Sequence, residues 1–222
     1  MAQSAVTEVP NASPIPSWLP RALMYGALAA VALLGVRFFV SDAVPYYTDI
    51  TADQYGRYWG MRPWFLGHIL GGTLALSMGP FQFWSGLKRR SLHVHKWTGR
   101  LYVGGIALGA TASVYLALTS PSSTDWTVGL LALAAAWVGT TSMAFYAIKR
   151  RKITFHKEWM IRSYVVTFAF VTFRWWSDIP AIRDYLGDSR PITLMWACWA
   201  IPLLVTEMVI QMRAMGRGRA KA

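Results

Sequence analysis

Long apolar runs separated by short polar connections make up most of this chain. An α-helix rises about 1.5 Å per residue, so about 20 apolar residues cross a hydrocarbon layer about 30 Å thick. We predict six transmembrane helices: residues 22–40, 64–84, 97–118, 126–148, 159–176 and 191–212. Pro80 is expected to bend or end the second of them. The pattern therefore predicts an all-α membrane protein with its membrane domain over residues 21–212.

The overall composition agrees with a membrane protein. The chain is 55% hydrophobic and only 14% charged, which is a low charge content for a soluble domain. Its net charge is +12, but the basic residues cluster between apolar runs. We therefore expect the lipid bilayer, and not nucleic acid, to be their partner. Cys198 is the single cysteine, so no disulfide forms within the chain.

The basic residues also predict how the chain crosses the membrane. They concentrate in the second and fourth connections and in the C-terminal segment, while the other three connections are balanced or acidic. Cytoplasmic loops of membrane proteins carry an excess of Lys and Arg. We therefore expect both termini on the cytoplasmic side, with a flexible tail at residues 1–20 and a basic tail at residues 213–222.

The two basic connections carry a sequence repeat. Residues 88–102 read KRRSLHVHKWTGRLY and residues 149–164 read KRRKITFHKEWMIRSY. Both contain Lys-Arg-Arg and His-Lys at the same places, and Trp, Arg and Tyr recur after one inserted residue. The spacing (149 − 88 = 61 residues) covers one helical hairpin, so spans two and three are predicted to be a copy of spans four and five. We expect these hairpins to form a four-helix core, with spans one and six outside it.

Within the repeat, His95 and His156 hold equivalent places. Two histidines on facing helices of a four-helix core can meet at its axis and hold a haem iron or another transition metal. The arginines that follow can balance haem propionates or bind an anionic lipid, and the tryptophans can pack on a flat ring. These residues are Arg100, Arg162, Trp97 and Trp159. The alternative is that both histidines are interfacial anchors or bond a neighbouring backbone carbonyl.

A second group of polar residues lies toward the opposite side of the membrane. His68, Arg37 and Arg174 can hold a quinone headgroup, an anion or a haem with a single protein ligand. The place equivalent to His68 in the second hairpin is Gly129, so we expect no second bis-histidine haem. The alternative for His68 is a hydrogen-bonded residue in a close, glycine-mediated helix contact.

Glu207 is the carboxylate of the sixth predicted span. An acidic side chain at this depth needs a partner, because an unpaired charge in the membrane is costly. The simplest partner is Arg100 or Arg162. The alternative is a metal site of two histidines and one carboxylate, formed with His95 and His156.

Four motifs carry a resemblance to a known family. They begin at His68, Gly79, His95 and His156 and read HILGG, GPFQF, HKWTGRLY and HKEWMIRSY. Together they resemble a bacterial family of uncharacterised multi-span membrane proteins, the domain of unknown function 2306. The resemblance implies a multi-pass protein of the bacterial inner membrane and brings no activity with it. More loosely, the histidine-bearing core is similar to the membrane b-type cytochromes. It departs from their pattern because the fourth histidine is missing.

These observations favour a membrane redox or cofactor-binding protein. The leading hypothesis is one haem b held by His95 and His156, with electrons exchanged with quinone. The alternative is a non-enzymatic accessory subunit or assembly factor of a larger respiratory or photosynthetic membrane complex, with other subunits as partners. A small-solute transporter is a third class, for which Glu207 is a coupling group. The sequence has no phosphate loop, CxxC or HExxH motif, which removes those chemistries.

Overall fold

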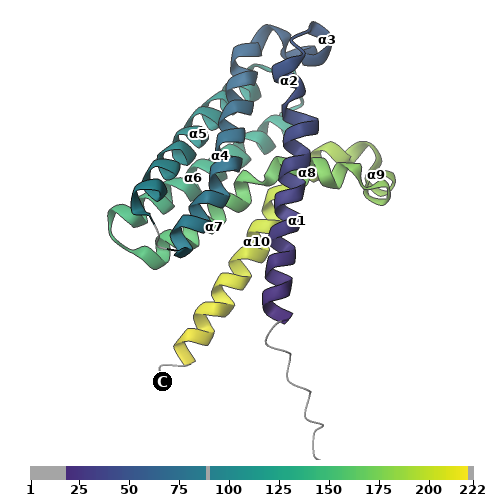
Figure 1. The fold of residues 1–222 in the computed structure, drawn as a ribbon. Coiled ribbons are helices and arrows are strands. Elements are labelled where there is room, and N and C mark those ends of the chain that lie inside the picture. The colour runs from purple at the N-terminus through teal and green to yellow at the C-terminus, as the bar shows by residue number, and fades with distance from the viewer. Residues whose placement is uncertain (1–18, 89–90, 220–222) are drawn as a thin grey trace, which may run out of the picture.

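The computed structural model describes residues 19–88 and 91–219, and this part of the chain is helical and contains no strand (Figure 1). Residues 1–18, which make up most of the predicted N-terminal tail, lie outside the described residues. The helical elements in chain order are α1 Leu19–Phe38, η1 Phe39–Ala43, α2 Pro45–Thr48, α3 Ala52–Tyr55, η2 Gly56–Met61, α4 Arg62–Lys88, α5 Leu92–Thr119, α6 Thr124–Lys149, α7 Ile153–Thr167, α8 Ala169–Asp178, α9 Pro180–Leu186, η3 Gly187–Ser189 and α10 Arg190–Arg219. The all-α fold class is confirmed.

Several helical stretches have the length and composition of transmembrane helices. Among the described residues four such stretches occur: Ala29–Thr48, Leu92–Thr119, Thr124–Lys149 and Pro180–Met215. The other two predicted spans, residues 64–84 and 159–176, correspond to α4 and to α7 with α8. His68 lowers the hydropathy of the first stretch, and an interruption at Phe168 divides the second into helices of 15 and 10 residues. The chain is thus a helical membrane protein, and its six-span count stays a prediction.

The helices differ from the predicted spans in three places. Phe168, with φ −80° and ψ −1°, separates α7 from α8 inside the fifth predicted span. Helix α4 continues through Pro80 as far as Lys88, so Pro80 does not end this helix. Helix α10 continues to Arg219, so most of the predicted basic tail is helical.

Serine side chains cap two of the long helices. Ser91 accepts a hydrogen bond from the Val94 N–H at the start of α5, and Ser123 accepts one from the Trp126 N–H at the start of α6. Each cap satisfies a backbone donor that the first turn of a helix leaves without a partner. Between α6 and α7, Arg151 has a left-handed φ of 57°, which allows the chain to reverse within a short turn.

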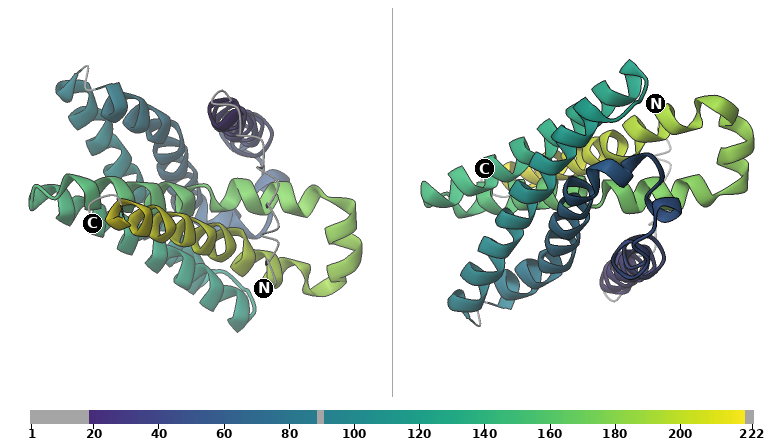
Figure 2. Two further views of the ribbon diagram at one scale, coloured as in Figure 1. Left: turned by 90° about the horizontal axis from the view of Figure 1, so that it is seen from below. Right: turned by 90° about the horizontal axis from the view of Figure 1, so that it is seen from above.

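Helices α4 to α7 lie together in one bundle, at the left in Figure 1. Helix α4 packs on α5, α6 packs on α7, and the contact of α5 with α6 joins the two hairpins. Helix α10 packs against α6, α7 and α8, while α1 contacts α8 (Figure 2). The N-terminal part of α1 and the C-terminal part of α10 extend away from the bundle. Helix α10 therefore covers the second hairpin, and the first hairpin has no comparable contact with it.

Glycines allow α4 and α5 to pack at very short distance. A methyl group on Gly105 would lie 2.8 Å from the Gly71 carbonyl oxygen, and one on Gly71 would lie 2.7 Å from the Gly109 Cα. Ala75, one turn beyond Gly71, is fully buried. Small residues at helix interfaces allow this close approach in membranes. This is the kind of contact that we gave as the alternative explanation for His68.

A buried polar cluster joins α5, α6 and α7. The Tyr102 hydroxyl oxygen lies 2.8 Å from the Ser163 Oγ and 3.0 Å from the Thr167 Oγ1. Thr141 and Ser163 share a hydrogen bond of 2.7 Å, and the Trp137 indole N–H donates to Thr167 at 2.8 Å. Tyr102 and Ser163 are completely buried. Buried hydroxyl groups must satisfy one another, so this cluster holds α5 and α6 against α7.

Tyr164 holds α7 against α4 through the Gly79-Pro80 pair. Pro80 has no N–H, so the carbonyl of Leu76, four residues earlier, lacks its usual helical donor. The Tyr164 hydroxyl group donates to this carbonyl at 3.2 Å. A methyl group on Gly79 would lie 2.9 Å from the Tyr164 Cζ and still closer to two other ring carbons. The Gly79-Pro80 pair therefore forms a notch for Tyr164 inside a continuous helix.

Candidate functional site

His95 lies near the start of α5, and its ring reaches back to α4. Its Nδ1 lies 3.0 Å from the Ser85 Oγ, and the Ser85 hydroxyl group donates to the Phe81 carbonyl at 2.7 Å. Because that hydroxyl hydrogen is already used, the His95 Nδ1–H donates to Ser85 and the neutral ring keeps its lone pair on Nε2. The Gln82 amide donates to the His95 backbone carbonyl at 2.8 Å and also to Thr98. Two residues of α4 therefore fix the position of His95.

His156 holds the equivalent position near the start of α7. Its Nδ1 lies 2.9 Å from the Ala144 carbonyl oxygen on α6. A carbonyl oxygen only accepts, so the Nδ1–H donates and the lone pair of the neutral ring is on Nε2, as in His95. A metal-bound histidine usually makes such a hydrogen bond with its second nitrogen. It is equally the carbonyl contact expected of a purely structural histidine.

The contact between Tyr102 and Ser163 shows how α5 and α7 face each other. Tyr102 follows His95 by seven residues, and Ser163 follows His156 by seven residues. Seven residues are close to two turns, so each histidine lies on the same helix face as that contact, about 10 Å nearer the basic loops. By helix periodicity the two histidines thus share the helix faces of the Tyr102–Ser163 contact, while the His95 ring bonds α4 and the His156 ring bonds α6.

Arg162 is the buried member of the arginine pair. Its side chain is 10% exposed, and its Nε and Nη2 donate to the Glu207 Oε2 at 2.8 and 2.6 Å. Gln211 donates to the other Glu207 oxygen at 2.7 Å, and the Arg162 guanidinium lies 4.7 Å from the centre of the Trp159 ring. The expected ion pair of Glu207 is confirmed, with Arg162 as its partner. Among the described residues no group of three His, Cys, Asp or Glu side chains can hold a metal ion, so Glu207 does not complete a metal site.

Arg100 is the exposed member of the pair. Its guanidinium carbon lies 4.9 Å from the centre of the Trp97 ring, which repeats the contact of Arg162 with Trp159. Within residues 19–88 and 91–219, however, no carboxylate forms an ion pair with Arg100. Each arginine therefore lies over a tryptophan ring, but among the described residues only Arg162 forms an ion pair with a carboxylate.

His68 lies in the body of α4, at the close contact with α5. Its Nδ1 lies 2.9 Å from the Gly109 carbonyl oxygen, so the Nδ1–H donates to that carbonyl. Its ring meets the Phe170 ring of α8 edge to face, with the ring centres 5.9 Å apart. His68 therefore has a structural partner through Nδ1, and its Nε2 keeps the lone pair of the neutral ring.

The two arginines predicted to share a site with His68 form ion pairs elsewhere. Arg37 of α1 lies 2.5 Å from Asp178 of α8, and Arg174 of α8 lies 3.5 Å from Asp42 of η1. These two ion pairs tie the α1–η1 stretch to α8. No contact among the described residues joins either arginine to His68.

The sequence alone did not identify the hydroxyl groups that complete the polar contacts. They belong to Ser85, Thr141, Ser163 and Thr167. Serine and threonine are common in transmembrane helices, where their side chains bond neighbouring helices or their own backbone, so their positions alone identify no partner. The repeat marked Tyr102 and Tyr164 without assigning them a role. The one usable signal was Pro80, whose missing N–H leaves the carbonyl of Leu76 free for Tyr164.

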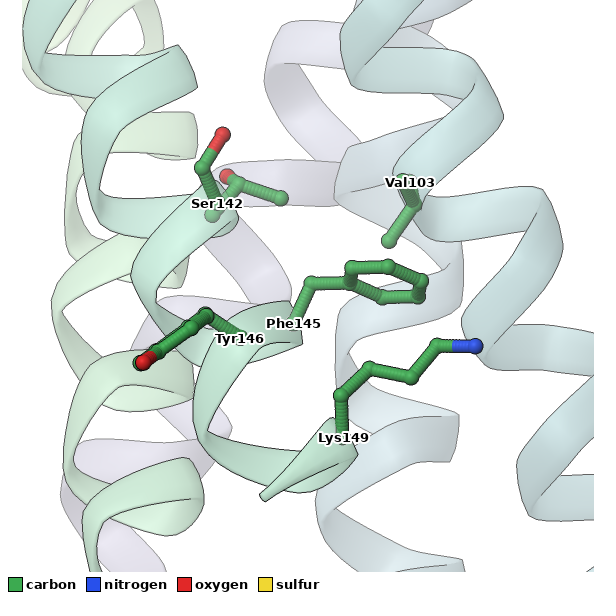
Figure 3. Close-up of a pocket in the computed structure, with 6 residues that line it drawn as sticks. Val103, Ser142, Phe145, Tyr146 and Lys149 are labelled. Atoms are coloured by element: carbon green, nitrogen blue, oxygen red, sulfur yellow. The ribbon is translucent and has the colours of Figure 1, made fainter.

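A groove of about 270 Å³ runs between α5 and α6 (Figure 3). The residues that line it are Val103, Thr141, Ser142, Phe145, Tyr146 and Lys149. Figure 3 shows the side chains of Phe145 and Lys149 projecting from α6 toward α5, with Val103 opposite. The volume is close to the lower end of the range for small-molecule sites, about 300 Å³.

The fold and these contacts define a helical membrane protein with two histidine-bearing hairpins. The model of the family described as "Predicted membrane protein (DUF2306)" matches residues 65–210, which is more than half of the chain. The chain belongs to this family, as its motifs indicated. Comparisons with curated proteins and with solved structures give no match, so the looser similarity to b-type cytochromes gains no support from them.

Proposed function

We propose that this protein is a redox protein of the bacterial inner membrane that holds one haem b between His95 and His156. The observation that carries the proposal is the buried hydrogen bond between Tyr102 and Ser163. It lies seven residues beyond each histidine, on the faces of α5 and α7 that bear them. Facing helices of a bundle are a common place for a cofactor, and two imidazoles are good axial ligands for haem iron.

The hydrogen bonds of the two rings suit iron ligation. His95 donates from Nδ1 to Ser85, and His156 donates from Nδ1 to the Ala144 carbonyl, so Nε2 is the free nitrogen in both. Arg162, within two turns of His156, uses its Nε and Nη2 for Glu207 and keeps the Nη1 donors for an anionic group such as a propionate. When bound, the haem supplies one-electron chemistry.

The topology that belongs to this proposal has six spans and both termini in the cytoplasm. Helix α4 has 27 residues, which is ample length for one crossing, and α7 continues into α8 to make another. Both stretches contact the bundle that contains α5 and α6. The basic connections after α4 and α6 then lie on the cytoplasmic side, as the distribution of Lys and Arg favours. The two hairpins are copies of one unit in this topology.

Quinone is the proposed electron partner, on the side away from the basic loops. The support is His68, whose Nδ1–H bonds the Gly109 carbonyl and leaves Nε2 to accept a hydrogen bond from a quinol. Arg37 and Arg174 act there through their ion pairs, by tying α1 and η1 to α8 beside Phe170, which contacts the His68 ring.

Absorption spectra of the purified protein test haem binding. Wild-type protein produced with sufficient haem is expected to show a reduced-minus-oxidised haem b signal, and His95→Ala and His156→Ala are expected to abolish it. His93→Ala is the matched control, because His93 is exposed in the same segment and lies against Trp97. A wild-type protein without haem overturns the proposal. Partner subunits that then co-purify in stoichiometric amounts would identify an accessory subunit instead.

A further inference from the structure

The groove between α5 and α6 has apolar walls that face outward from the bundle. Val103 lies on one side and Phe145 on the other (Figure 3). Phe145 and Tyr146 are 50% and 54% exposed, although both line the groove. In a membrane, an exposed apolar groove of this kind contacts hydrocarbon. Its shape and chemistry suit an acyl chain, which needs only dispersion contacts.

Lys149 gives this groove a positive charge, and Arg100 lies toward the same end of the bundle. Lys149 lines it, with its Nζ 5.3 Å from the centre of the Phe145 ring. Arg100 lies three residues before Val103, which places both on one flank of α5. Because α5 begins and α6 ends at the same end of the bundle, Arg100 and Lys149 lie toward that same end of the bundle. Among the described residues neither has a carboxylate partner within ion-pair distance.

In the second hairpin, a carboxylate neutralises the charge of the equivalent arginine. Arg162 pairs with Glu207, which α10 supplies. Helix α10 packs on α6, α7 and α8, so it supplies no such carboxylate to Arg100. An anion from the surroundings can take the place of Glu207, and at a membrane surface the abundant anion is a lipid phosphate.

We propose that this groove binds a phospholipid with an anionic headgroup. One acyl chain lies along Val103 and Phe145, and the phosphate lies between Lys149 and Arg100. The site uses neither His95 nor His156, so it does not depend on the haem proposal. It assigns Arg100 a role that its exposed position over Trp97 leaves open.

Native mass spectrometry of the detergent-solubilised protein tests the site. Titration with phosphatidylglycerol is expected to give tighter binding than titration with phosphatidylcholine. Lys149→Gln and Arg100→Gln are each expected to weaken phosphatidylglycerol binding about fivefold. Phosphatidylcholine binding should weaken less, because its choline cation offsets the charge of its phosphate. Lys152→Gln is the matched control, because Lys152 belongs to the same basic connection and lies over Phe155, outside the groove.

Ser142→Trp tests the acyl-chain part of the site separately. Ser142 is exposed and lines the groove, so an indole ring there is expected to fill the groove and weaken the binding of both lipids. Inorganic phosphate in excess is expected not to displace phosphatidylglycerol, since it offers no acyl chain. Equal affinity for the two lipids, equal loss in Lys152→Gln, or full displacement by phosphate would each overturn the proposal.

Discussion

The two histidine-bearing hairpins contain equivalent histidine and arginine residues, but these residues make different contacts in each hairpin. In the first hairpin, α4–α5, His95 bonds a serine hydroxyl group, and Arg100 is exposed without a carboxylate partner among the described residues. In the second, α6–α7, His156 bonds a backbone carbonyl and Arg162 is buried against Glu207 of α10. The difference follows from what packs outside each hairpin, because α10 covers only the second. A repeated residue thus acquires its role from its neighbours outside the repeat.

The hairpins also differ in how their own helices are joined. Helices α4 and α5 approach until backbone meets backbone at Gly71, Gly105 and Gly109. In the second hairpin, side-chain hydroxyl groups connect α6 with α7, through the hydrogen bond of Thr141 with Ser163. Where backbones touch, a substitution that adds a side-chain atom causes a clash. Where hydroxyl groups connect the helices, a substitution removes only the hydrogen bonds of that one side chain. The first hairpin should therefore be the less tolerant of substitution at its interface.

The largest effect is expected from Gly71→Ala. The added methyl group would meet backbone atoms of Gly105 and Gly109, which cannot move aside as a flexible side chain can. We expect a loss of about 3 kcal/mol in the free energy of unfolding, or no folded protein. Gly72→Ala is the control, because a methyl group there meets nothing within 4 Å. Thermal unfolding in detergent measures both, and equal stability of the two variants would contradict the backbone contact.

A smaller difference is expected between the two arginines. Arg162→Gln removes two charge-assisted hydrogen bonds to Glu207, which should cost about 2 kcal/mol. Arg100→Gln removes only an exposed contact with Trp97 and should change stability by less than about 0.5 kcal/mol. Chemical unfolding of both variants checks this order. Equal costs would mean that α10 does not distinguish the hairpins.

The smallest difference is expected between the two tyrosines. Tyr102→Phe removes a hydroxyl group that bonds Ser163 and Thr167 in the core, at a cost of about 1.5 kcal/mol. Tyr164→Phe removes one hydrogen bond, to the Leu76 carbonyl, and should cost about 1 kcal/mol. The same unfolding measurement separates them. A larger loss for Tyr164→Phe would show that the notch at Gly79 and Pro80 depends mainly on the hydroxyl group.

Much of the fold follows from the sequence, because apolar runs of membrane length determine where helices lie. Residues 64–84, 97–118 and 126–148 fall inside α4, α5 and α6. The ion pair of Glu207 with Arg162 was also predictable, since a carboxylate in an apolar span needs a cation. The choice of Arg162 over Arg100 was not, because it depends on where α10 packs.

Other features depend on contacts between distant residues and left no clear mark in the sequence. Helix α4 continues through Pro80 because Tyr164 supplies a donor to the Leu76 carbonyl and Gly79 leaves room for its ring. The interruption at Phe168 occurs without glycine or proline at that position. Serine and threonine side chains become informative only once their partners are known, as Ser163 does beside Tyr102.

The ratio of haem to protein chain in wild type, His95→Ala and His156→Ala tests most directly whether the two hairpins build one site together. If His95 and His156 share one iron, wild-type protein should contain one haem per chain and each single variant should contain none. The same ratio in His93→Ala as in wild type would show that the loss is specific. Haem retained in one of the two variants, or absent from the wild type, would contradict the shared site.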